Sequence, residues 1–143
     1  MNKGEPMDTL NRECLHQIHQ SARLLSKKAN EALAAYDLYM SQWTVLFCLD
    51  TFGPKTQKDI WTYLNVEAPT ITRTVTRLEA NGWVKRVQGK DKRENLIVMT
   101  DDAKARFEEI KRTMEQFEEE CLSDFTYEEK QLLHTLLHKL STE

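Results

Sequence analysis

Hydrophobic residues recur at helical spacing through most of this 143-residue chain. Over residues 8–36 and again over 101–122, apolar positions lie alternately three and four residues apart, which is typical of a helix that packs along another helix. A further helix with five leucines is expected after residues 126–129, whose Thr-Tyr-Glu-Glu sequence fits a capping box. The pattern therefore predicts long helices towards both ends of the chain.

The middle of the chain holds shorter elements. Apolar spacing predicts helices over 41–50, with Phe47 among its core candidates, and over 57–64, which Thr56 and Asp59 are expected to cap. The turn-forming pair Gly53-Pro54 separates them. A longer helix is expected over 67–82, because this segment has a proline suited to a first helical turn and ends at a glycine. The last two of these helices are joined by a short turn, which is typical of a helix-turn-helix.

The period then changes from helical to extended. Residues 83–87 and 96–99 are predicted to be two strands of a β-hairpin joined by a polar, glycine-bearing segment, and Thr100 is expected to cap the helix that follows. A helix-turn-helix followed directly by such a hairpin is a winged helix. The predicted fold class is therefore mainly α, a winged helix-turn-helix domain over residues 37–100 with a two-stranded β-wing. Dimerisation helices are expected to flank it, in residues 1–36 and 101–143.

The formal net charge of −3 hides a strong asymmetry. Residues 55–93 contain nine Lys or Arg and four Asp or Glu, which gives +5. The rest of the chain contains eleven basic and nineteen acidic residues, which gives −8. A basic segment in an acidic chain indicates one surface that meets a polyanion and another that is kept away from it.

The helix expected over 67–82 has an apolar stripe on one side and, on the other, two guanidinium groups and several hydroxyls without an acid. That face suits the phosphates and base edges of a DNA major groove, and the alternative is an ordinary solvated face. The four cations in residues 86–93 suit phosphates or a minor groove, and the alternative is a charged loop. The predicted DNA contacts are Pro69, Thr70, Thr72, Arg73, Thr76 and Arg77 on the helix, and Arg86, Lys90, Lys92 and Arg93 on the wing.

The outer helices have more apolar surface than the rest of a single chain can cover. A homodimer built from both ends of the chain would cover it and would set two recognition helices at a fixed distance. The predicted dimerisation residues are Leu15, Ile18, Phe107, Ile110, Met114, Phe117, Leu133, Leu136, Leu137 and Leu140.

Several functional classes find no support in the sequence. No nucleophile–base pair, phosphate-binding glycine loop or carboxylate dyad is evident, so neither an enzyme nor a cofactor is expected. Cys14, Cys48 and Cys121 are far apart and lack metal-ligand spacing, so no metal site is expected. No apolar run approaches the roughly 20 residues of a membrane span, and the N-terminus lacks the apolar segment of a signal peptide. The protein is expected to be cytoplasmic, without a membrane partner.

The order of these parts and several short runs resemble the MarR family of bacterial transcriptional regulators, over essentially the whole chain. The most specific match is the wing motif, Asp91-Lys-Arg93 ahead of a short apolar strand that ends in Thr100. The other matching runs are Leu38 with Gln42-Trp43-Thr-Val-Leu46, Thr56-Gln-Lys-Asp-Ile60, Val66 with Pro69-Thr-Ile-Thr-Arg73, and Arg77-Leu78-Glu79 with Gly82-Trp83-Val84.

The resemblance implies a winged-helix homodimer that binds pseudo-palindromic double-stranded promoter DNA, commonly as a repressor. It implies that Arg93 enters a flanking minor groove. It also adds Asp91 to the expected DNA-binding residues of the wing, because this aspartate is expected to brace Arg77 of the recognition helix. The chain departs from the family pattern at Glu67, where an N-cap serine is usual, and at Trp61, where a small residue is usual.

The family's effector pocket usually lies between the dimer helices and the winged helix. By this resemblance a small apolar or phenolic effector is expected to release the DNA. The pocket residues expected by analogy are His19, Arg23, Tyr36, Tyr39, Met40 and Trp43. Two alternatives remain open at this point, a thiol-based redox regulator acting through Cys14 and a helical protein-interaction adaptor.

Overall fold

The computed structural model describes residues 6–141, with side chains from Thr9 onward. These residues form six α-helices, one 3₁₀ turn and one two-stranded antiparallel sheet. In chain order the elements are α1 (Pro6–Leu33), η1 (Ala34–Tyr36), α2 (Met40–Phe52), α3 (Gln57–Leu64), α4 (Ala68–Ala80), β1 (Val84–Gln88), β2 (Asn95–Met99), α5 (Asp101–Cys121) and α6 (Tyr127–Ser141). The predicted mainly α, winged-helix fold is confirmed, and residues 1–5 and 142–143 of the predicted dimerisation region lie outside the described residues.

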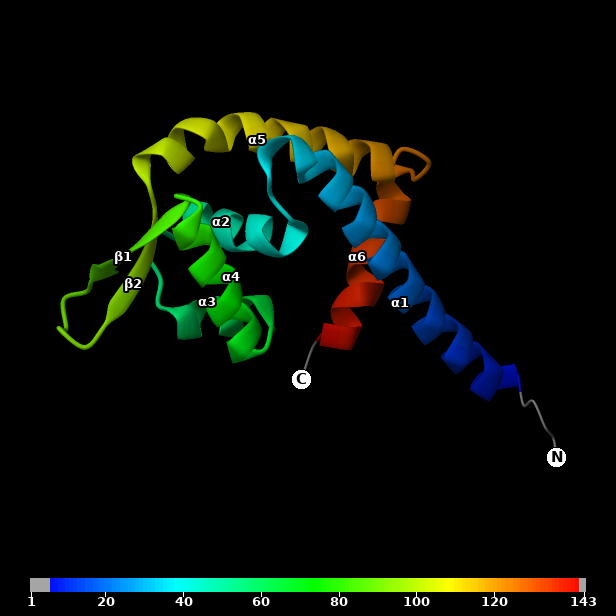
Figure 1. The fold of residues 1–143 in the computed structure, drawn as a ribbon. Coiled ribbons are helices and arrows are strands. Elements are labelled where there is room, and N and C mark those ends of the chain that lie inside the picture. The colour runs from blue at the N-terminus through cyan, green and yellow to red at the C-terminus, as the bar shows by residue number, and fades with distance from the viewer. Residues whose placement is uncertain (1–5, 142–143) are drawn as a thin grey trace.

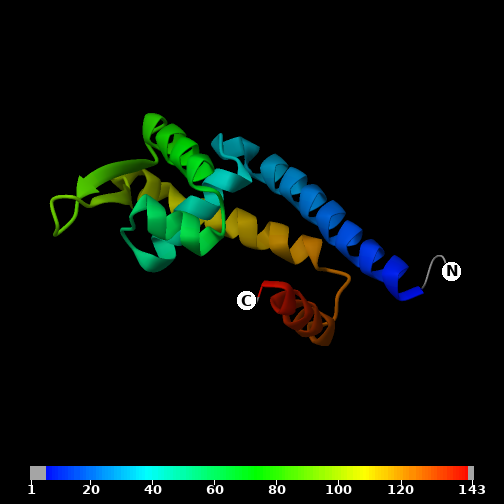
Figure 2. The ribbon, with the colours of Figure 1, turned by 90° about the horizontal axis from the view of Figure 1, so that it is seen from below.

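The winged helix, from α2 to β2, lies along one end of α5, and α1 extends away from it (Figure 1). The wing projects from the side of the molecule opposite the N-terminus in both views (Figures 1 and 2). After α5 the chain turns back into α6, which stands apart from the winged helix (Figure 2). The arrangement therefore separates the predicted DNA-binding elements from the outer part of α1 and from α6.

Helices α3, α5 and α6 begin where side chains satisfy free backbone N–H groups. Thr56 and Asp59 form a reciprocal capping box, with N–O distances of 3.1 and 3.4 Å. Thr126 and Glu129 form another at the start of α6, at 3.1 and 2.9 Å. Thr100 caps α5 through its hydroxyl oxygen, which accepts a backbone hydrogen bond at 3.2 Å. All three caps were predicted, and the structure confirms them.

The wing is a regular hairpin tied to the helices at its base. β1 and β2 pair from Val84 opposite Met99 to Gln88 opposite Asn95. Lys55, in the loop before α3, also pairs with Ile97 of β2, by backbone hydrogen bonds of 3.2 and 2.7 Å. Backbone hydrogen bonds therefore join the hairpin base to the loop ahead of α3. The backbone hydrogen bonds of the tip, between residues 89 and 94, stay within the hairpin.

One hydrophobic core runs through the winged helix into both long helices. It starts with Ala29 and Leu33 of α1, includes the inner faces of α2, α3, α4 and the sheet, and extends to Met114 of α5. Within it, the Trp43 indole of α2 stacks on the Phe107 ring of α5, with 5.0 Å between ring centroids. The N-terminal half of α5 is therefore built into the winged helix, and packing does not divide the chain between β2 and α5.

Three residues predicted to form a dimer contact on α5 belong to this core instead. Phe107, Ile110 and Met114 are buried within the single chain, so they have no surface left for a partner. Helical spacing identifies an apolar face, but not which element covers it. Conversely, Phe47 was expected in the core and is 41% exposed.

Exposed leucines are concentrated on two helices. Helix α6 buries none of its residues, and Leu132, Leu136, Leu137 and Leu140 are 58, 49, 43 and 61% exposed. The other exposed leucines of the described chain all lie on α1, and they are Leu10, Leu15, Leu24 and Leu25. Among residues 6–141, every helix is too short or too polar to traverse a lipid bilayer.

Candidate nucleic-acid interface

Helix α4 presents the face expected to contact DNA. Its inner side is closed by Ile71, Val75 and Leu78, which are buried against the rest of the winged helix. Among the predicted contacts, Pro69, Thr72, Arg73, Thr76 and Arg77 are exposed and Thr70 is half-buried. The amphipathic pattern therefore correctly separated the two sides of this helix.

The exposed hydroxyls of α4 are oriented by their own helix. Thr72 Oγ1 donates to the Ala68 carbonyl oxygen at 3.1 Å, and Thr76 Oγ1 donates to the Thr72 carbonyl oxygen at 2.8 Å. Because their hydrogens are used within the helix, these hydroxyls offer lone pairs and methyl groups to a partner. Such side chains suit a base amino group or a thymine methyl better than a phosphate.

Arg73 and Arg77 lie one helical turn apart on the outer side of α4. Neither forms an ion pair within residues 6–141, and Arg73 has one long contact of 3.5 Å, from Nη2 to Thr70 Oγ1. These guanidinium groups therefore have no salt bridge to break before binding a phosphate or the edge of a guanine.

The wing tip displays the other predicted cations. Lys90, Lys92 and Arg93 are exposed beside Asp91, at the end of the hairpin (Figure 1). Asp91 Oδ1 accepts a hydrogen bond from the Arg93 backbone N–H at 3.0 Å, so this carboxylate shapes the turn at the tip. The brace from Asp91 to Arg77 that the family resemblance implied is absent from the described residues.

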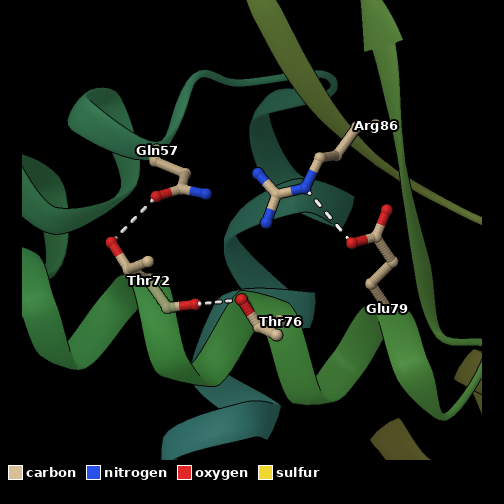
Figure 3. A network of polar contacts seen from close by, with 5 residues as sticks. All are labelled: Gln57, Thr72, Thr76, Glu79 and Arg86. Atoms are coloured by element: carbon tan, nitrogen blue, oxygen red, sulfur yellow. Dashed lines mark hydrogen bonds and ion pairs between the residues drawn. The ribbon is translucent and has the colours of Figure 1, made fainter.

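Arg86 does not join the cations at the tip. It is half-buried in β1, and its side chain turns back towards α4, where Nε lies 3.2 Å from Glu79 Oε1 (Figure 3). Gln57 of α3 lies on the other side of the guanidinium group (Figure 3). Sequence position groups Arg86 with the wing, whereas the packing of the hairpin on α4 determines its partners. No signal in the sequence marked Gln57 and Glu79 as the partners of Arg86.

The six residues expected to line an effector pocket do not come together. Trp43 is buried in the core, and Tyr36 Oη lies 2.7 Å from Thr113 Oγ1 of α5. His19 and Arg23 are exposed on α1, and neither lines the larger cavity described next. The remaining two, Tyr39 and Met40, do line that cavity.

Two cavities lie where α1 meets the start of α2. The larger, of about 530 Å³, is lined mainly by residues with polar groups and reaches α4; its lining residues are Ser26, Asn30, Tyr39, Met40, Ser41, Thr44 and Arg77. The smaller, of about 250 Å³, is mostly apolar and reaches α5; it is lined by Leu25, Ser26, Ala29, Met40, Met114, Phe117, Glu118, Cys121 and Leu122. Ser26 and Met40 line both. Sequence reasoning missed the small polar lining residues, because their spacing has no distinguishing pattern.

The predicted dimerisation residues outside the core remain accessible. Leu15, Leu136, Leu137 and Leu140 are exposed, and Ile18, Phe117 and Leu133 are half-buried. Cys14, the candidate redox cysteine, is also exposed on α1.

A basic, outward-facing second helix beside a hairpin places the molecule in the winged-helix class of helix-turn-helix proteins.

Within that class, the chain belongs to the MarR family. The family model matches residues 38–94, from the start of α2 through the wing tip. The relative YwoH of Bacillus subtilis (strain 168), an uncharacterized HTH-type transcriptional regulator, is 61% identical over 125 residues, which cover 87% of this chain and 91% of YwoH.

Solved structures of the family have the same fold. A mutant of MarR from E. coli, in complex with operator DNA, has a TM-score of 0.83 and 25% identity, covering 98% of this chain and 99% of that one. A MarR/EmrR family transcriptional regulator from Acinetobacter sp. ADP1 also has a TM-score of 0.83 and 25% identity, covering 92% of this chain and 94% of that one.

Proposed function

We propose that this chain is a transcriptional regulator that binds double-stranded DNA sequence-specifically, as a homodimer on a pseudo-palindromic operator, and represses the promoter it covers. The observation that supports this most directly is the outer face of α4. It presents two guanidinium groups that form no salt bridge within residues 6–141, together with exposed hydroxyls whose hydrogens are used within the helix. Beside it, the wing tip adds three exposed cations.

The distribution of charge supports the same face. The basic residues of 55–93 lie in the helix-turn-helix and wing, whereas the last turns of α5 are acidic. Partial desolvation and, to a smaller extent, the nearby charge of Glu115 raise the pKa of Glu118 above its ordinary value. DNA would therefore be attracted to α4 and the wing and repelled from the end of α5.

The exposed leucines of α1 and α6 support the homodimer. A twofold axis through these helices would bury both apolar faces with a single self-complementary contact. The two copies of α4 would then face successive major grooves, about 34–36 Å apart, and an operator with two inverted half-sites would match them.

We propose that a small apolar or phenolic effector binds in the two cavities at the α1–α2 junction and thereby releases the protein from DNA. One cavity offers polar groups and the other apolar walls, which is the combination expected of a small-molecule site. A ligand acts only through its preference for one arrangement of the helices. Moving a 1:99 population to 99:1 needs a preference of about ten-thousandfold, or about 5.5 kcal/mol.

The DNA-binding proposal is tested with a duplex that the wild-type protein selects from a random pool, using fluorescence anisotropy. Arg73→Ala should weaken binding by about 1–3 kcal/mol, roughly fivefold to 150-fold, because it removes a base or phosphate contact. The matched control is Arg112→Ala, which removes an exposed arginine from α5 and should leave the affinity unchanged.

Failure to select any duplex would contradict DNA binding, and equal losses in the two variants would contradict the assignment of α4. Repression is tested separately with a promoter that contains the selected sequence. Added protein should lower the yield of transcript from it in vitro, and an increase would show activation instead.

A further inference from the structure

A chain of polar contacts links α3, α4 and β1 below the wing tip (Figure 3). Arg86 Nε of β1 donates to Glu79 Oε1 of α4 at 3.2 Å. The Gln57 amide of α3 lies between the Arg86 guanidinium and Thr72 Oγ1 of α4, 3.1 Å from that hydroxyl. The three elements that form the helix-turn-helix and the wing are therefore joined by side chains at one point.

Hydrogen-bond chemistry determines the orientation of the Gln57 amide. The Thr72 hydroxyl hydrogen is used by the Ala68 carbonyl oxygen, so Thr72 Oγ1 is an acceptor for Gln57. When the amide NH₂ faces Thr72, its oxygen lies 2.6 Å from Nη1 and 3.3 Å from Nη2 of Arg86. The opposite orientation would place donors against donors, so the oxygen faces the guanidinium group.

In this orientation the Arg86 guanidinium group is held by the protein on two sides. Nε is bound to the Glu79 carboxylate, and both Nη atoms face the Gln57 oxygen. The positive charge is balanced by Glu79, in contrast to Arg73 and Arg77, which have no ion pair in the described chain. Three of its five N–H groups are then used within the protein, and binding a phosphate through these would break the contacts with Glu79 and Gln57.

We propose that Arg86 is a positioning residue and not a DNA contact, and that with Gln57 and Glu79 it fixes the base of the wing to α3 and α4. This inference rests on the proposed DNA-binding function. The backbone pairing of Lys55 with Ile97 holds the other strand of the hairpin at the same level. Together these two ties set the angle of the hairpin, and hence the place where the tip cations meet DNA.

The single ion pair is not enough to support such a role, because the Arg86 and Glu79 side chains are 31 and 41% exposed and solvent weakens their attraction. The geometry of the fork matters more. A guanidinium group can satisfy Glu79 and Gln57 at the same time, whereas a lysine ammonium has the charge without the planar fork. Replacement by lysine therefore separates a role in geometry from a role in charge.

The experiment measures the salt dependence of binding to the selected duplex for Arg86→Lys and Gln57→Ala. Each lost phosphate contact lowers the slope of log affinity against log salt by about 0.9. Neither substitution changes the net charge, yet both should lower the slope by about one unit or more, because the tip cations would no longer meet phosphates together. Lys85→Gln, which removes an exposed cation from the same strand, calibrates the effect of one charge.

Reduced slopes in both charge-neutral variants, with wild-type thermal unfolding, support the positioning role. A slope change of this kind is not produced by a smaller folded fraction, which lowers the apparent affinity alone. If Arg86→Lys and Gln57→Ala keep the wild-type slope, Arg86 does not position the wing and the inference is overturned. Wild-type protein that binds no duplex would instead overturn the proposed function itself.

Discussion

The uncovered leucines of α6 provide a direct test of the proposed homodimer. Replacing Leu136 and Leu140 by alanine removes side chains that are 49 and 61% exposed in the single chain. Because α6 buries none of its residues against the rest of the chain, these substitutions should have little effect on the fold of one protomer. Their effect should appear in association instead.

The size of the effect follows from the exposed area. Fully burying a leucine stabilises by about 1.5–3 kcal/mol, so burying the exposed half contributes about 1 kcal/mol. In a twofold dimer the two substitutions remove four such side chains, and association should weaken by about 4 kcal/mol. That loss corresponds to roughly a thousandfold increase in the dimer Kd.

Sedimentation equilibrium over a range of concentrations measures this Kd, and circular dichroism reports the helix content. The control is Tyr63→Ala, which removes a 60% exposed aromatic side chain from α3, outside the proposed interface. The control should keep the wild-type Kd. A Leu136→Ala, Leu140→Ala variant that dimerises as tightly as wild type would refute the assignment of α6 to the interface.

Three further predictions concern the wing, the cavity and the cysteines. Arg93→Ala should weaken DNA binding and lower the salt slope by about 0.9, and an unchanged affinity would show that the wing tip does not meet DNA. Thr44→Trp should fill the polar cavity, so phenolic acids that release the wild-type protein from DNA should no longer release this variant. Titration followed by anisotropy measures the release, and a response retained in Thr44→Trp would show that the effector binds elsewhere. Burial raises the pKa of the Cys48 thiol, an effect that Lys55 opposes, so less thiolate forms at a given pH. Exposed Cys14 should react with iodoacetamide first, as mass spectrometry can show, and faster modification of Cys48 would contradict its burial.

Local signals in the sequence determined most of the elements. A threonine followed three residues later by Asp or Glu marked the starts of α3 and α6, because such a pair satisfies backbone N–H groups whatever the tertiary structure. The change from a helical to an extended pattern after α4 located the hairpin, because this pattern is also a local property of the sequence. The DNA-facing side of α4 was predictable as well, since an amphipathic helix has only one side to bury.

Features that depend on a partner in space were not predictable in this way. The spacing of Phe107 and Ile110 shows an apolar face on α5, but their burial depends on how α5 packs against α1 and the winged helix. Arg86 is one cation among several in the sequence, and it is distinguished by the packing of β1 beside α4. Likewise, Trp43 was assigned to the pocket by analogy with the family, whereas its indole stacks on Phe107 in the core.

The continuous core limits how an effector can change DNA binding. Because the C-terminal end of α1, α4, the sheet and α5 as far as Met114 pack into one core, these elements must move together. The apolar cavity lies at the edge of this unit, between Leu25 of α1 and Leu122 at the end of α5. A ligand there would alter the angle between this unit and α6 with the outer part of α1, and so the distance between the two copies of α4, without altering α4 itself. Binding to an operator with two half-sites should then fall, while binding to a duplex with one half-site should stay the same. A ligand that contacts Arg77 in the polar cavity would instead weaken both, so comparing the two duplexes identifies the cavity through which release occurs.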